Sequence, residues 1–304
     1  MSERITPAMV TGSTLNDINS ALGSLERSSN ELSSGRSILE PSDNPYGASR
    51  AIDLQSQLDG LTSYTNSAQD GISWESTATG AMSNMSNLAE RARELLVQSS
   101  NGVYNQGDRN NIAAEIEQLA QTIKQDANTQ YAGQYVFSGT ATDTAPYLQG
   151  ENDAYQGNAE AVTRVIGPNA SVTVNTNISS LLGNGMASGD GKLLDVLGTI
   201  AQHLRGGTTE DLQALSSTDL KNLDGNIETL TQLQANAGSA TDQLQMAVSR
   251  IEGLQVTITQ TLSNTEDVDF AKASIDYSNE QAAYDAALRA GANIVQESLL
   301  NFLH

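Results

Sequence analysis

The fold is decided by residues 15–32, which read LNDINSALGSLERSSNEL. One set of positions in this stretch, apolar except for one serine, recurs in alternating steps of three and four residues: Leu15, Ile18, Leu22, Leu25, Ser29 and Leu32. This spacing places a single apolar stripe along a helix. A lone amphipathic helix near the end of a chain cannot bury such a stripe, so the pattern predicts a partner.

The far end of the chain carries a matching stripe. Its members fall one or two heptads apart with one small slip, at Tyr277, Tyr284, Leu288, Val295, Leu299 and Phe302. The two stripes could pack only on each other within one chain, but an isolated two-helix pair has little to shield it, so we expect assembly with other molecules. The predicted assembly interface consists of Leu15, Ile18, Leu22, Leu25, Leu32, Tyr284, Leu288, Val295, Leu299 and Phe302.

Between these ends the apolar pattern stays helical except in one region. Helical spacing runs from about Ala51 to Ser99, through Ile112 to Ile123, and again from Leu193 to Leu262. Short β-branched or aromatic runs separated by Gly, Pro, Asn and Asp predict strands within residues 134–180. The predicted fold class is mainly α, a long antiparallel helical rod or coiled coil built from the N- and C-terminal halves, with a small inserted β domain.

Three domains follow from this order of elements. Residues 1–43 and 266–304 form a terminal coiled-coil domain that we expect to be disordered in the monomer. Residues 44–133 and 181–265 form a helical rod domain, and residues 134–180 form the small β insertion. The sequence Ser42-Asp43-Asn44-Pro45 offers helix caps followed by a proline suited to the first helical position, which predicts a joint between helices.

Composition excludes several classes of function. The formal net charge is −21, from 36 acidic and 15 basic residues, so no basic cluster exists that would bind nucleic acid or an anionic membrane. No apolar run is long enough to cross a bilayer. The chain has no cysteine, which excludes disulfides and thiolate chemistry. Residues 1–6 lack the pattern of a cleaved signal peptide.

We find no motif that marks a catalytic, cofactor-binding or metal-binding site, and we expect a protein that is not an enzyme. His203 and His304 lack metal-ligand partners at useful spacing. The glycine-rich residues 183–192 fail the phosphate-loop pattern and predict a flexible loop. The acidic group around Asp267 lacks the spacing of a calcium loop and is explained by the start of a helix. A secreted enzyme with its active site in the β insertion is a rival hypothesis, which the small size of that insertion disfavours.

Several motifs resemble the flagellin superfamily. Residues 32–38 (LSSGRSI), residues 41–48 (PSDNPYGA) and residues 91–98 (RARELLVQ) are similar to its signatures, and the resemblance covers nearly the whole chain. Three further stretches resemble the members of that superfamily found at the hook–filament junction: Arg4-Ile5-Thr6, residues 133–140 (GQYVFSGT) and the C-terminal residues 298–303 (SLLNFL). Asn44 departs from the pattern, because a second Asp is usual there.

This resemblance implies a structural adaptor of the bacterial flagellum, secreted by flagellar type III export without a cleaved signal. Its partners would be neighbouring copies of itself in a ring, the hook-associated protein on the hook side and flagellin on the filament side. Before export a cytoplasmic chaperone would cover the C-terminal stripe at Leu288, Val295, Leu299 and Phe302. The alternative within the superfamily is a flagellin, the filament subunit itself.

Overall fold

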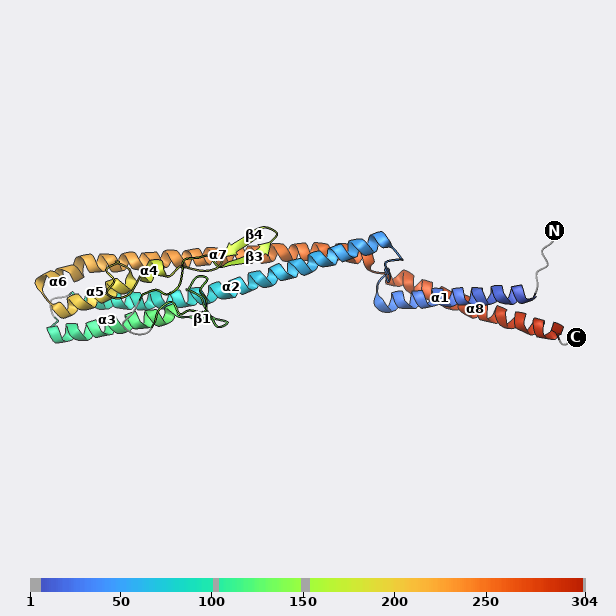
Figure 1. Ribbon diagram of the computed structural model, residues 1–304, viewed down its shortest axis with the longest axis horizontal. Coiled ribbons are helices and arrows are strands. Elements are labelled where there is room, and N and C mark those ends of the chain that lie inside the picture. The colour runs from blue at the N-terminus through green and yellow to red at the C-terminus, as the bar shows by residue number, and fades with distance from the viewer. Residues whose placement is uncertain (1–6, 101–103, 149–153, 303–304) are drawn as a thin grey trace. The chain divides into compact units, whose positions relative to one another are not determined.

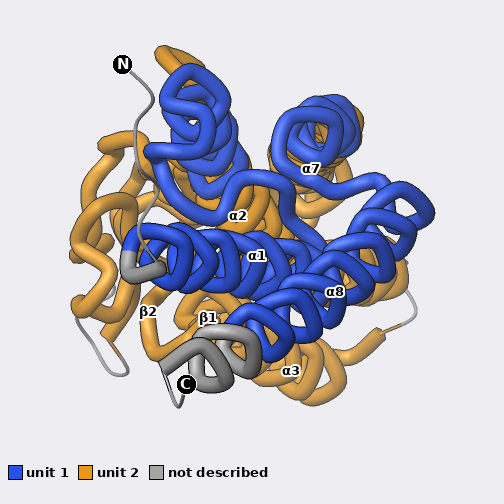
Figure 2. Tube along the Cα trace, turned by 90° about the vertical axis from the view of Figure 1, so that its right-hand side faces the viewer, with its two compact units in different colours: residues 1–60, 254–304 blue, residues 61–253 orange. Residues whose placement is uncertain are grey.

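The computed structural model describes residues 7–100, 104–148 and 154–302 and divides the chain into two compact units (Figures 1 and 2). Unit 1 consists of residues 1–60 and 254–304, and unit 2 consists of residues 61–253. Helix α2 (Pro45–Ser99) and helix α7 (Leu220–Glu266) each contribute residues to both units. The predicted class, mainly α with a small β insertion, is confirmed.

Unit 1 contains the two terminal helices. Helix α1 (Pro7–Ser34) packs along helix α8 (Phe270–Phe302), and the two run side by side in opposite directions (Figure 1). Next to this pair, the first turns of α2 and the last turns of α7 bury a small cluster formed by Ala51, Leu54 and Leu262. The predicted pairing of the two ends of the chain is therefore present within one molecule.

Helix α2 begins where the sequence places its caps. The Asn44 Oδ1 atom accepts a hydrogen bond from the Gly47 backbone N–H at 2.9 Å. Pro45 is the first helical residue, and a backbone N–H at this position would have no partner within the helix, so proline fits there. The helix then continues for 55 residues through Gly71 and Gly80 without a break. Gly71 is buried, and a Cβ atom there would lie 3.1 Å from Leu244 on α7, so the small residue permits close packing.

Unit 2 adds shorter helices to these two. They are α3 (Gln106–Ala127), α4 (Ser179–Leu182), α5 (Leu193–Gly206), α6 (Thr209–Ala214) and the π-helical turn η1 (Leu215–Asp219). Helix α3 starts with a capping box in which the Asn105 side chain accepts from the backbone N–H of Asp108. Helix α3 packs against α5.

Two antiparallel hairpins form the β part of unit 2. Strands β1 (Gln130–Tyr131) and β2 (Gln134–Tyr135) make the first, and strands β3 (Thr163–Gly167) and β4 (Ala170–Thr173) make the second. The first hairpin starts four residues before the predicted insertion. Strand β1 has only two residues, too few to show the alternation that marks a strand, and its turn residues Ala132 and Gly133 adopt positive φ angles of 49° and 81°. The second hairpin contains a register shift between Val165 and Gly167.

The core of unit 2 is built from both its helices and its hairpins. Trp74 on α2 is 1% exposed, meets Tyr131 edge to face at a centroid separation of 6.1 Å, and carries the Arg164 guanidinium over its ring at 5.6 Å. Arg164 also donates to the Asp70 carboxylate at 2.7 Å. These contacts attach both hairpins to α2, so the β part belongs to the same core as the helices.

Candidate assembly surface

The apolar stripe of α1 is only half covered. Ile18, Leu22, Leu25 and Leu32 are partly buried. Leu15 is 56% exposed. Packing against α8 therefore does not enclose the stripe of α1.

The described part of the α8 stripe is not enclosed either. Tyr284 is partly buried, whereas Leu288 is 42% exposed. Val295, Leu299 and Phe302 lie in the helical part of α8 but outside the residues whose side chains are described. The structure therefore brings the described members of the predicted interface onto one helix pair without burying any of them.

Two small residues of α8 are buried in unit 1. Gly291 of α8 is buried, and a Cβ atom there would lie 2.9 Å from Ile18 Cδ1 and 3.4 Å from Thr14 Cγ2 of α1. Ala273 near the start of α8 is 3% exposed. The absence of a side chain at Gly291 therefore lets α8 come close to α1 at Ile18 and Thr14.

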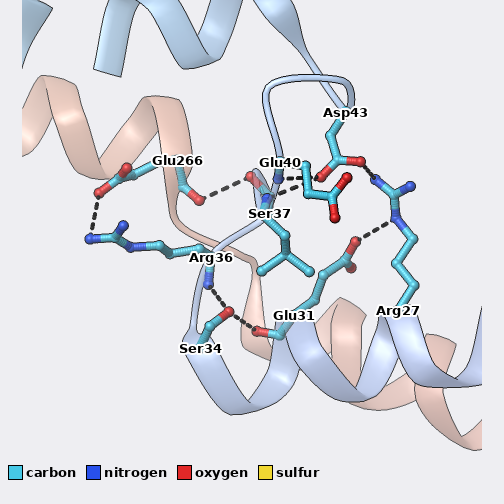
Figure 3. A network of polar contacts seen from close by, with 9 residues as sticks. Arg27, Glu31, Ser34, Arg36, Ser37, Glu40, Asp43 and Glu266 are labelled. Carbon is cyan, nitrogen blue, oxygen red and sulfur yellow. Dashed lines mark hydrogen bonds and ion pairs between the residues drawn. The ribbon is translucent and has the colours of Figure 1, made fainter. Parts of the chain in front are cut away.

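The chain segments that follow α1 and precede α8 are joined by backbone hydrogen bonds (Figure 3). The Ser37 N–H and Ser37 hydroxyl both donate to the Glu266 carbonyl, at 2.7 and 3.0 Å, and the Val268 N–H donates to the Gly35 carbonyl at 3.0 Å. The Arg36 guanidinium pairs with the Glu266 carboxylate at 3.4 Å. This short ladder fixes the C-terminal end of α1 beside the start of α8.

Asp43 organises the loop between α1 and α2 (Figure 3). Its Oδ2 atom accepts from the backbone N–H groups of Leu39 and Glu40, both at 3.0 Å, and its Oδ1 atom meets the Arg27 guanidinium at 2.9 Å. The hydrogen bonds from the backbone, chiefly that of Glu40, lower the pKa of Asp43 below its ordinary value. The carboxylate thus ties the loop back to α1.

Unit 1 also exposes apolar side chains that the heptad spacing does not identify. Tyr46, Ile52, Val256, Phe270 and Ile275 are 75%, 67%, 71%, 64% and 62% exposed. They lie at helix starts or off the heptad positions, so periodicity does not select them. For Val256 and Ile275 the signal in the sequence is a large apolar residue between two polar neighbours.

Potential metal-ligating side chains do not gather among the described residues. No group of three or more His, Asp or Glu that could hold a metal occurs among them. His203 contacts the buried Asp219 carboxylate through Nδ1 at 2.6 Å, and His304 lies outside the described residues. Within the same described part, none of the helices combines the length and the apolarity needed to cross a membrane.

Two sequence motifs that suggested ligands are used internally. In the glycine-rich loop, the Gly189 and Gly191 N–H groups donate to the Asp195 carboxylate at 2.8 and 3.0 Å, so a carboxylate of the chain occupies these two donors. That the loop is flexible stays a prediction. At the start of α8 the Asp269 side chain accepts from the Ala271 and Lys272 N–H groups, at 3.0 and 3.1 Å. The helix-start explanation is confirmed for Asp269; Glu266 is instead the last residue of α7, and its carboxylate pairs with Arg36.

Comparison with known proteins identifies the family. The model of the bacterial flagellin N-terminal helical region matches residues 5–142, and that of the flagellin C-terminal helical region matches residues 220–303. Flagellar hook-associated protein 3 of Escherichia coli K12 is 25% identical over 276 residues, which cover 86% of this chain and 87% of that protein. Flagellin FlaB2 of Treponema pallidum is 26% identical over 288 residues, or 92% of each chain.

A solved structure supports the same fold. A flagellar hook-associated protein from Vibrio parahaemolyticus superimposes with a TM-score of 0.66 at 16% sequence identity, over 74% of this chain and 100% of that one. The chain belongs to the flagellin superfamily, whose members are structural proteins of the bacterial flagellum. Within that superfamily it resembles flagellar hook-associated protein 3.

Proposed function

We propose that this protein is the adaptor between hook and filament, joining a hook-associated protein on the hook to the first flagellins. The observation that carries the proposal is the half-covered stripe of the terminal helices, at Ile18, Leu22 and Leu25. Apolar side chains left accessible along a helix pair favour burial against further helices. The similarity to hook-associated protein 3 and the motifs at residues 133–140 and 298–303 favour the junction over the filament.

An adaptor needs different neighbours above and below it, so its contacts are heterologous. We infer that neighbouring copies form a ring in which the interface residues Leu15 to Leu32 and Tyr284 to Phe302 meet the adjoining proteins. In this proposal the terminal segments 1–43 and 266–304 become fully ordered only on assembly, residues 44–133 and 181–265 keep the partners apart, and residues 134–180 are carried as an insertion. The protein acts outside the cell, after export.

A double substitution tests the proposal. Leu22→Ala with Leu25→Ala removes apolar surface from the shared stripe, while both side chains are only partly buried in the single chain. We expect the melting temperature of the monomer to change little and attachment to bare hooks to be lost. Asn19→Ala with Asn30→Ala, at exposed positions of the same helix, is the matched control and should attach normally. Normal attachment of the leucine variant would contradict the proposal.

The alternative function, a flagellin, predicts a different result with the purified chain. A filament subunit polymerises into long filaments when seeded, whereas an adaptor should stop after a short layer and then accept flagellin. Electron microscopy of hooks incubated with this protein alone, and then with flagellin added, separates the two. Long filaments from the first incubation, with this protein alone, would favour the alternative that the protein is itself a flagellin.

We also propose that an export chaperone covers Leu288, Val295, Leu299 and Phe302 before assembly. An accessible apolar helix face fits the helix-in-groove mode of binding and would otherwise promote aggregation. Replacing Leu299 and Phe302 with Ser should weaken chaperone binding in calorimetry and also prevent attachment to hooks. A variant that binds the chaperone normally but fails to attach would show that the stripe serves assembly alone.

A further inference from the structure

Unit 2 contains a cavity whose lining residues are not part of the terminal stripes. Its volume is about 280 Å³. It lies between α2, the segment that follows β4, and α7, and it is lined by Glu75, Thr173, Asn175, Thr176, Asn177, Leu233, Asn236, Ala237 and Ala240. The proposed adaptor function uses none of these residues.

Glu75 is the feature that sets this cavity apart. Glu75 is 2% exposed, and its buried Oε2 atom makes no hydrogen bond to a described residue. Burial raises the pKa of Glu75 to about 7. An unpartnered buried carboxyl group is costly unless something enters the cavity to pair with it.

The polar groups around Glu75 leave donors available. The Asn177 Oδ1 atom accepts from Ser179, and the Asn236 Oδ1 atom accepts from Gln232 at 3.1 Å, so the amide nitrogens of both asparagines keep donors without partners among the described residues. Thr173 and Thr176 add hydroxyl groups. The third amide, that of Asn175, is already used, because it bonds the Val162 N–H and the Glu160 carbonyl.

No other charge faces the cavity. Among its lining residues Glu75 alone is titratable, and the α7 side is formed by Leu233, Ala237 and Ala240 with Asn236. Arg164 of β3, which contacts α2, does not line the cavity and is already paired with Asp70. An anion would therefore be repelled by the Glu75 carboxylate, with no cation in the lining to offset the repulsion. A simple ammonium ion, which can only donate hydrogen bonds, would face the N–H donors of the asparagines.

We propose that this cavity binds a small uncharged polyhydroxylated molecule, a polyol or a single sugar ring. Each hydroxyl group of such a ligand can donate to the Glu75 carboxylate and accept from an amide N–H, which is the combination that the lining presents. The apolar wall of α7 would contact the carbon skeleton of the ligand. The proposal is independent of the adaptor function and can fail or succeed without it.

Binding should tighten as the pH rises. A ligand hydroxyl that donates to Glu75 stabilises the ionised form and lowers its pKa, so binding releases a proton. Saturation-transfer NMR on the full chain with D-glucose and D-mannitol should show saturable binding that is several-fold tighter at pH 8.5 than at pH 5.5. Butylammonium chloride and sodium acetate serve as charged probes and should bind more weakly.

Three variants make the test specific. Glu75→Ala should weaken binding by at least about tenfold, since it removes a charge-assisted acceptor. Ala240→Leu keeps Glu75 but fills the cavity and should also abolish binding, which decides the matter if Glu75→Ala does not fold. Glu90→Gln, at an exposed position of the same helix, should bind like the unchanged protein. Failure of both polyols to bind, binding that survives Ala240→Leu, or preference for butylammonium would overturn the proposal.

Discussion

The two units of this chain are built from the same kind of helix but bury their side chains very differently. In unit 2, Trp74, Phe137 and Tyr147 are at most 1% exposed, whereas in unit 1 Leu22 and Leu25 are only partly buried and Leu15 is 56% exposed. Unit 2 has hairpins and short helices that cover the long helices from further sides. The terminal pair has one contact face for each helix, and two helices alone cannot enclose a core.

This difference has an energetic consequence. Ordering a residue costs about 1–2 kcal/mol of backbone conformational free energy, and full burial of a large apolar side chain returns about 1.5–3 kcal/mol. Half-buried stripes return a fraction of that. Unit 2 should therefore be stable in a single chain, and the terminal pair should depend on neighbours for the rest of its burial.

Limited proteolysis should show the largest effect of this difference. We expect trypsin to cut the monomer first at Arg27, Arg36, Lys272 and Arg289 in unit 1 and to leave a fragment that contains unit 2. The Arg91 side chain of unit 2 is 48% exposed, close to the 54% of Arg27, so exposure alone does not predict the order of cleavage. Mass spectrometry of the time course identifies the cuts, and equal cleavage at Arg91 and Arg27 would contradict the comparison.

Substitutions of apolar residues should lower the unfolding free energy by several kcal/mol more in unit 2 than in unit 1. Phe137→Ala removes a fully buried ring and should cost about 3–5 kcal/mol of unfolding free energy. Leu25→Ala in unit 1 should cost less than about 1 kcal/mol in the monomer, since the side chain is only partly buried. Urea denaturation followed by circular dichroism measures both. Equal losses would show that the terminal pair already has a core.

The buried carboxyl of unit 2 should make stability depend on pH. Its pKa is raised from 4.5 to about 7, so the folded state binds the proton more tightly, and stability falls as the pH rises from about 4.5 to 7. A shift of this size corresponds to about 3 kcal/mol as an upper bound. Glu75→Gln should therefore stabilise the protein at pH 8 and have little effect at pH 4. Melting curves at both pH values, with Glu90→Gln as control, test this sign.

The smallest expected effect concerns the loop between α1 and α2 in unit 1, which Asp43 holds by hydrogen bonds. The pKa of Asp43 is lowered, so its stabilising contacts are present above its ordinary pKa and are lost as the pH falls through the lowered value. Asp43→Asn should speed hydrogen exchange at the Leu39 and Glu40 amides at neutral pH without moving the melting temperature of unit 2. Asp53→Asn, at an exposed position of α2, is the control. Unchanged exchange would mean that Asp43 does not hold the loop.

Local signals located most of the helix boundaries. The caps at Asn44 and Pro45 set the start of α2, and the acidic residues near Asp269 set the start of α8, because both depend on hydrogen bonds to neighbours within three residues. The start of the first hairpin at Gln130 is not predicted, because the two residues of β1 are too few to show the period of a strand. The predicted assembly interface does not include the exposed Tyr46, Val256 and Phe270, because heptad spacing selects stripes rather than single residues.

The sequence by itself determined the helical class, the pairing of the terminal stripes and the superfamily, because periodicity, caps and motifs are local properties of the chain. Only the tertiary structure decided how far each stripe is covered. Exposure of Leu15 and burial of Trp74 depend on what other segments pack there, and both residues lie on equally regular helices. The cavity beside Glu75 has the same origin, since it is lined by α2, the segment after β4, and α7, which are far apart in the sequence.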